Sequence, residues 1–307
     1  ALDETKNNYL MAVVYTGNNY GIATVDITTG DFFVTEVTSE RALLDEINKF
    51  TPSELVCNEA LFMSGLDMDE LKERYHFAVT ALENRFFSDD DCRKILKEHF
   101  HVMSLEGLGL GDYENGMIAS GAVLQYLYET QKNDLSHLTK ITPYTTGQFM
   151  MIDTSTRRNL ELVETLREKQ KRGSLLWVLD KTKTAMGARL LRSFIEQPLI
   201  DKAEIERRQQ AIEELNMNYI SREEIREYLN SVYDLERLMG RISYKTANPR
   251  DLLSFKNSLE MLPYIKDILG EFSCELLKKM NEDLDPLRDL YELIDRSIVD
   301  EPPISLR

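Results

Sequence analysis

Three apolar, β-branched runs follow one another near the amino end, and their spacing constrains the fold more than any other feature. They cover residues 10–16, 20–28 and 32–37, and turn residues (Asn, Thr, Gly and Asp) fill the gaps at 18–19 and 29–31. Short runs joined by tight turns predict an antiparallel meander of three strands. The chain therefore begins with a sheet rather than with a helical bundle.

Helices alternate with short strands after this meander. Apolar periodicity and β-branched runs predict further elements at residues 40–50, 55–57, 67–74, 77–82, 88–100 and 116–132. Ser88, followed by three aspartates, is a helix start, because its hydroxyl can cap free N–H groups and carboxylates are favoured at the positive end of a helix dipole. The order predicts an α/β, ribonuclease-H-like domain.

The second half of the chain has a helical pattern almost throughout. A connection containing Pro, Thr and Gly at residues 140–147 marks a boundary, so we predict domains at 1–142 and 143–307, the second of them all-α. Helix caps are expected at Asp201, Ser221, Asn248 and Asp285. The run KQKRG, which ends at Gly173, is expected to be a solvated turn.

Charge is spread unevenly along the chain. The net charge is −16, which argues against a dedicated nucleic-acid binder. Residues 1–145 hold 24 acidic and 11 basic residues, whereas the window 157–192 holds 10 basic and 4 acidic ones. Arg157 and Arg158 are therefore candidates for contact with a DNA backbone. The alternative is that they structure the chain through local ion pairs with residues such as Glu161.

The cysteines and the hydropathy of the chain indicate the cellular compartment of the protein. The three cysteines are far apart and lack metal-ligand spacing, which favours a reducing, cytoplasmic environment. No apolar run approaches the ~18 residues of a membrane span, so no membrane association is expected.

Two patterns resemble catalytic motifs without completing them. Gly111 and Gly116 have the spacing of a phosphate-binding loop, but Met117 and Ile118 stand where Lys and Ser or Thr are needed. Without such a loop, this chain is not expected to be an enzyme or to hold a cofactor. The four histidines, at positions 76, 99, 101 and 137, are scattered, so no metal site is expected either.

A metal-dependent nuclease of ribonuclease-H-like fold is the alternative function. Asp26, Asp31 and Glu36 flank the second turn, and carboxylates on adjacent strands can clamp two metal ions. The first strand, LMAVVYT, carries no carboxylate at the position such a nuclease needs. The competing interpretation is that the three acids are solvated turn residues.

Long stretches of the sequence resemble the MutS family of DNA mismatch-repair proteins. MIDTSTRRNLEL, SLLWVLDKTKTAMGARLLRSFIEQPLID and DLERLMGRISYKTANPRDLLSFKNSL are similar to the beginning of the MutS core domain. VVYTGNNYGIATVDITTGDFFVTEV and GAVLQYLYETQK are similar to its connector domain. The resemblance extends over nearly the whole chain.

This resemblance implies a connector followed by the first part of the core, or lever, domain. These residues do not include the mismatch-reading, clamp and ATPase domains of the family, and Phe194-Ile195-Glu196 is not its mismatch-reading Phe-x-Glu motif because it lies in the core segment. The implied role is to couple mismatch recognition to the ATPase. The full-length protein would use ATP and Mg²⁺, bind mismatched duplex DNA and form a homodimer.

The resemblance also implies that the acidic connector docks a MutL-like matchmaker protein. On the helix that follows the three aspartates, Cys92 and Leu96 face inward by spacing, whereas Lys94, Lys97 and Glu98 face outward. The outward residues are the predicted docking site. The alternative is an ordinary solvated helix face.

Overall fold

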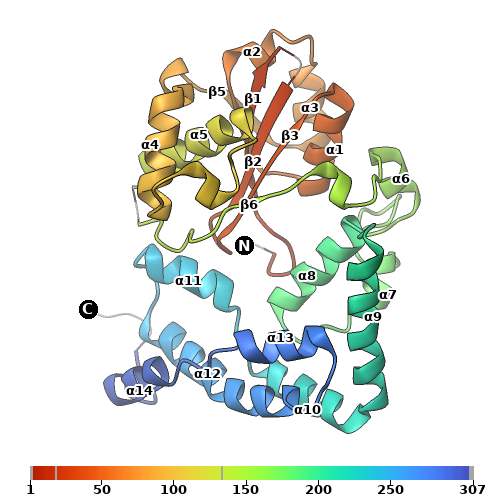
Figure 1. Ribbon diagram of the computed structural model, residues 1–307, viewed down its shortest axis with the longest axis vertical. Coiled ribbons are helices and arrows are strands. Elements are labelled where there is room, and N and C mark those ends of the chain that lie inside the picture. The colour runs from red at the N-terminus through yellow and green to blue at the C-terminus, as the bar shows by residue number, and fades with distance from the viewer. Residues whose placement is uncertain (1–2, 18, 133, 304–307) are drawn as a thin grey trace. The chain divides into compact units, whose positions relative to one another are not determined.

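The protein is divided into two compact units, residues 1–160 and 161–307. The computed structural model shown in Figure 1 describes residues 3–17, 19–132 and 134–303. Unit 1 is a mixed sheet with helices and unit 2 is helical, so the predicted fold class is confirmed. The predicted turn residue Asn18 lies outside the described residues.

The sheet of unit 1 contains six strands in the order β5-β4-β1-β2-β3-β6. The strands are β1 (Leu10–Thr16), β2 (Asn19–Asp26), β3 (Asp31–Val37), β4 (Glu54–Cys57), β5 (Ala78–Ala81) and β6 (Thr142–Pro143). β1, β2 and β3 pair antiparallel, which confirms the predicted meander. β4, β5 and β6 join the sheet in parallel pairs. The edge strand β6, which the sequence did not predict, falls where we placed the domain boundary.

Helices cover both faces of this sheet (Figure 1). Unit 1 contains the helices α1 (Glu40–Phe50), α2 (Glu59–Phe62), α3 (Met68–Tyr75), α4 (Asp89–Phe100), α5 (Glu114–Gln131) and α6 (Thr154–Asn159). Met11 and Val13 of β1 pack with Leu43 and Ile47 of α1, while α5 lies against β1, β2 and β3. A strand covered on both faces needs a continuous apolar run, which explains why β1 does not alternate.

Two glycines allow α5 to approach its neighbours. A Cβ at Gly121 would lie 2.3 Å from the Cβ of Cys92 on α4, and a Cβ at Gly21 would lie 2.2 Å from the backbone of Asn115. Real Cβ atoms do not come so close to other heavy atoms. The absence of a side chain at Gly121 therefore allows α4 to pack closely on α5 above the sheet.

Unit 2 consists of eight described helices. They are α7 (Leu175–Leu179), α8 (Ala185–Glu196), α9 (Lys202–Met217), α10 (Tyr219–Asn230), α11 (Leu235–Ser243), α12 (Pro249–Leu269), α13 (Glu275–Asp283) and α14 (Arg288–Ser297). Two predicted caps are confirmed. Asp201 accepts N–H groups of α9, and Asn248 forms a reciprocal capping box with Asp251 at the start of α12.

The other two predicted caps are wrong. Ser221 lies inside α10, which begins at Tyr219, and its hydroxyl donates to Glu271 at 2.7 Å instead. Asp285 accepts the N–H of Leu287, but α14 begins only after Leu287, whose φ is +51°. In both places a local signature exists, but the helix begins at another residue.

Candidate partner-docking and DNA-contact surfaces

Helix α4 presents the predicted docking residues on its outer side. Cys92 and Leu96 are completely buried, Lys94 and Glu98 are exposed, and Lys97 is half-buried. The arrangement follows from α4 packing on α5, which leaves one polar face in solvent. The geometry thus agrees with the predicted orientation, while the docking role itself stays a prediction.

The charge on this face is only partly neutralised. Arg93 forms an ion pair with Asp89 at 2.6 Å within the helix, and this hydrogen bond raises the pKa of Arg93. Among the described residues, no carboxylate lies within ion-pair distance of Lys94 or Lys97. Two ammonium groups therefore remain available for a carboxylate of a partner, which is the kind of rim contact that increases association rates.

His99 secures the inner side of the same helix. Its Nδ1 lies 2.6 Å from the hydroxyl of Tyr128 on α5, and its Nε2 lies 2.7 Å from the carbonyl oxygen of Leu138. Burial lowers the pKa of His99, so the neutral imidazole ties three segments together. Within residues 3–17, 19–132 and 134–303, no three His, Cys, Asp or Glu side chains are placed to hold a metal ion.

The three carboxylates considered for a nuclease are structural, and the idea that they are solvated turn residues is wrong. Asp26 is completely buried and accepts the side-chain amide of Asn7 at 2.8 Å, and the same amide donates to Asp31 at 3.0 Å. Glu36 accepts the N–H of Gly116 at 2.9 Å, at the start of α5. These acids fasten neighbouring segments to the sheet, and no observation favours the nuclease.

Arg157 and Arg158 lie on α6, the last helix of unit 1. Asp153 caps this helix by accepting the N–H of Thr156 at 2.7 Å and lies 3.3 Å from Arg41. Arg157 is half-buried and donates to the carbonyl of Ile152 at 3.3 Å, whereas Arg158 is exposed. Arg157 therefore has a structural contact, and the exposed side chain of Arg158 can reach an external phosphate. Contact of either arginine with DNA stays a prediction.

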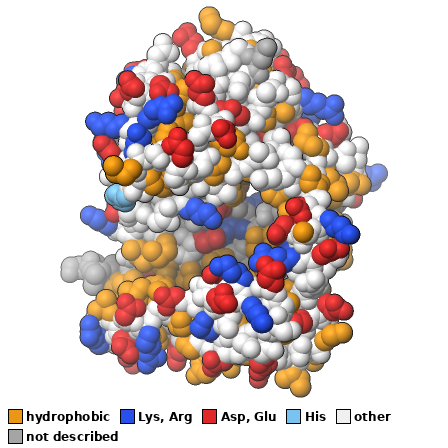
Figure 2. All heavy atoms as spheres, in the orientation of Figure 1, with side chains coloured by type: hydrophobic (Ala, Val, Ile, Leu, Met, Phe, Trp, Pro, Cys, Tyr) orange, Lys and Arg blue, Asp and Glu red, His pale blue; other side chains and the backbone are white. Residues whose placement is uncertain are grey.

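The basic run KQKRG that follows is the predicted turn, and all of its residues except the half-buried Lys171 are exposed. Lys171 forms an ion pair with Asp180, and the N–H of Thr165 donates to the carbonyl of Gln170 at 2.9 Å. On the face shown in Figure 2, basic and acidic side chains are mixed over the surface. This face offers no continuous basic track of the kind that follows a DNA backbone.

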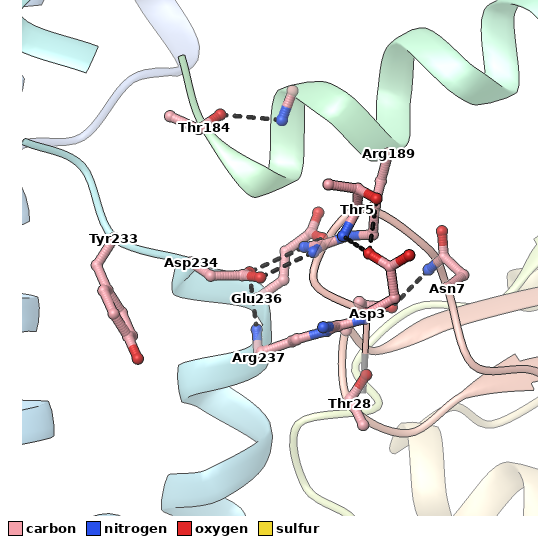
Figure 3. Close-up of polar contacts among 12 residues, drawn as sticks. Asp3, Thr5, Asn7, Thr28, Thr184, Arg189, Tyr233, Asp234, Glu236 and Arg237 are labelled. Atoms are coloured by element: carbon pink, nitrogen blue, oxygen red, sulfur yellow. Dashed lines mark hydrogen bonds and ion pairs between the residues drawn. The ribbon is translucent and has the colours of Figure 1, made fainter. Parts of the chain in front are cut away.

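A buried arginine in unit 2 was missed by sequence reasoning. Arg189 of α8 reaches two carboxylates at the start of α11, as Figure 3 shows: Asp234 accepts at 2.8 Å and Glu236 at 2.6 Å. Burial disfavours its charge, but the hydrogen bonds that it donates to both acids outweigh burial, so the pKa of Arg189 is raised. The only signal in the sequence was an arginine between apolar neighbours, which does not identify a partner 45 residues away.

Both units match domain models of one family. Residues 8–139 match MutS domain II, and residues 155–307 match MutS domain III. An α/β unit followed by a helical one, matched in this order, defines a two-domain segment of the MutS type. The chain belongs to the MutS family, which confirms the resemblance found in its sequence.

Relatives match along the whole chain. The DNA mismatch repair protein MutS of Lachnoclostridium phytofermentans is 63% identical over 306 residues, which are all of this chain and 33% of that protein. The same protein of Ruminiclostridium cellulolyticum is 48% identical, and that of Acetivibrio thermocellus 44%, each over all of this chain and 35% of the relative. The chain thus spans about a third of the length of these relatives.

Proposed function

We propose that this chain acts in DNA mismatch repair, as the connector and first part of the core that couple mismatch recognition to ATP hydrolysis in a longer protein. The observation that carries the proposal is the match of residues 8–139 and 155–307 to MutS domains II and III, with 63% identity to a mismatch repair protein along the full chain. The predicted domain division at residues 142 and 143 belongs to this proposal.

The architecture suits a mechanical role. Coupling between distant sites needs stiff elements that can adopt discrete arrangements. Helix α12 spans 21 residues and starts from a reciprocal capping box at Asn248, so its length suits it to act as a lever, although Pro263 interrupts its backbone hydrogen bonds. A close-packed α/β unit can move as one body when such a lever moves.

Cofactor and partners follow from the same proposal. ATP and Mg²⁺ would be bound by parts of the longer protein that this chain does not cover, and homodimerisation and contact with mismatched duplex DNA would belong to that protein as well. Arg157 and Arg158 would contact the DNA backbone or structure the core. In the part of the chain that the structure describes, no helix has the length and apolar character to cross a membrane. We propose a cytoplasmic location, at the nucleoid when bound to DNA.

A chimera tests this function. The segment of the L. phytofermentans protein that matches this chain is replaced by the chain, and the chimera is produced in a bacterial strain that lacks MutS. We expect the spontaneous mutation rate to fall to the level given by the unmodified relative. A stable chimera that leaves the rate as high as in the strain without MutS would contradict the proposal.

Docking of a MutL-like protein is tested on α4 in the same chimera. Reversing both charges with Lys94→Glu and Lys97→Glu should weaken MutL binding about tenfold, equivalent to ~1.4 kcal/mol, because two attractive contacts become repulsive. The control reverses two exposed lysines elsewhere in unit 1, with Lys132→Glu and Lys140→Glu. Equal affinity of the two variants would show that α4 is an ordinary solvated face.

A further inference from the structure

Residues 141–149, here called the strap, lie between the two matched family domains, yet their backbone is bound to the sheet of unit 1. Pro143 pairs in parallel register with Val34 on β3. The N–H of Tyr144 donates to the carbonyl of Val34 at 2.9 Å, and the hydroxyl of Thr35 donates to the carbonyl of Tyr144 at 2.7 Å. The segment expected to be a free connection is therefore an edge of the sheet.

The side chain of Tyr144 fastens the strap to helix α1. Its ring is buried, and its hydroxyl donates to the carboxylate of Glu46, which also pairs with Lys49 at 3.3 Å. The Nζ of Lys49 lies 4.3 Å from the ring centroid of Tyr144 and 5.5 Å from that of Phe149. The side chains of Glu46 and Lys49 are only 7% and 8% exposed. One buried charge pair thus contacts the strap at two points, Tyr144 and Phe149.

We expect the ion pair and the hydrogen bonds of this cluster to form and break together. A carboxylate buried with one ammonium partner depends on every remaining hydrogen bond, and loss of a donor leaves it incompletely paired in a medium of low polarity. Burial and the neighbouring Glu46 raise the pKa of Tyr144, so the hydroxyl keeps its proton at physiological pH. The Tyr144 hydroxyl can therefore donate to Glu46 as long as the strap lies on the sheet.

We propose that the strap is locked to unit 1 by Tyr144, and that the flexible joint of the chain lies beyond it, near Leu160 and Glu161. The compact units divide at this point, and Glu161 has a φ of +47°, which a residue with a side chain adopts only where a turn demands it. The fastened strap then moves with the sheet, so a pull from unit 2 on this joint acts on unit 1 as a whole. This mechanical role rests on the proposed function, whereas the fastening itself does not.

Hydrogen exchange of the 307-residue chain, measured by mass spectrometry, tests the fastening. We expect strap amides in the unchanged protein to exchange about as slowly as those of β3. In Tyr144→Phe they should exchange at least about tenfold faster, while β1 and β2 stay protected. Tyr75→Phe is the matched control, because the Tyr75 hydroxyl is buried without a hydrogen-bond partner among the described residues. Tyr75→Phe should leave the exchange rate of the strap amides unchanged.

Free exchange of the strap in the unchanged protein, or equal exchange in Tyr144→Phe, overturns the proposal. If Tyr144→Phe unfolded the entire unit, β1 amides would lose protection too. Thr35→Val, which removes only the hydroxyl bond to the strap, then supplies the comparison. These readouts involve no DNA, ATP or partner, so they stand apart from the repair test. In the chimera, Tyr144→Phe should raise the mutation rate above that of Tyr75→Phe, and equal rates would overturn the mechanical role.

Discussion

The two units bury their apolar side chains to very different extents. Among the described residues, seven large apolar side chains are exposed in unit 1 and nineteen in unit 2. A sheet covered on both faces by helices completes its own core, whereas helices arranged without a sheet leave much apolar surface in water. Unit 1 therefore depends on close packing, and unit 2 has less packing to depend on.

In unit 2, polar contacts compensate for the smaller amount of apolar packing. Its buried apolar residues form separate small clusters, one around Ile265 and Phe272 and another around Leu238 and Leu259. Hydrogen-bonded carboxylates attach further helices to these clusters, as the bonds from Arg189 of α8 to α11 show. The comparison predicts that unit 1 is sensitive to added volume and unit 2 to the loss of single polar partners.

The largest expected effect is overpacking of unit 1. Gly121→Ala places a Cβ 2.3 Å from the Cβ of Cys92, so α4 and α5 must separate and the unit should lose about 3 kcal/mol or more. Denaturant unfolding followed by hydrogen exchange measures this loss. Gly147→Ala is the control, because its Cβ meets no atom within 4 Å. Equal stability of both variants would contradict the view that unit 1 is tightly packed.

Removal of the buried arginine comes next. Arg189→Met leaves Asp234 without its charged partner and should destabilise unit 2 by about 2–3 kcal/mol, near the lower end for broken buried pairs because Glu236 is partly exposed. The fluorescence of Trp177, the only tryptophan of the chain, reports the unfolding of unit 2. Arg288→Met breaks an exposed pair and should cost less than ~1 kcal/mol. Similar losses in both variants would refute a special role for Arg189.

Replacement of exposed apolar residues on α7 should have a smaller effect on stability and a separate effect on dye binding. Val178 and Leu179 are 57% and 49% exposed, so replacing both by Ser should change stability by no more than ~0.5 kcal/mol. The same change should reduce the binding of a dye that senses apolar surface, such as ANS. Leu176→Ser, in the buried position of the same helix, should instead unfold the unit. Undiminished dye binding would mean that the exposed surface lies elsewhere.

The smallest effect concerns acid stability. Hydrogen bonds from Ser273 and Cys274 lower the pKa of Glu214 from 4.5 to about 2, so their stabilisation is complete above pH 4.5 and is lost as the pH falls toward 2. Glu214→Gln should therefore lose less stability than the unchanged protein across this range, as measured by urea unfolding at each pH. Glu213→Gln removes an adjacent exposed carboxylate and controls for net charge. Parallel pH profiles for Glu214→Gln and the unchanged protein would exclude this contribution.

Local patterns in the sequence sufficed wherever neighbouring residues decide the structure. The apolar run of β1 and the Asn248-Pro249 pair indicated a strand and a helix start correctly, because strand and cap preferences act within a few residues. The same reasoning failed at Ser221, where a cap signature lies inside a continuous helix. It also missed β6, since a strand of two residues has no periodicity to recognise.

The sequence by itself determined the order of elements, the fold class and the family, because periodicity and motif similarity are properties of contiguous residues. Only the tertiary structure decided which polar groups meet. The hydroxyl of Thr35 finds the carbonyl of a residue 109 positions away, and Glu46 finds Tyr144 98 positions away. Such pairs depend on where folding places two distant segments, and for that reason the strap became visible only in the folded molecule.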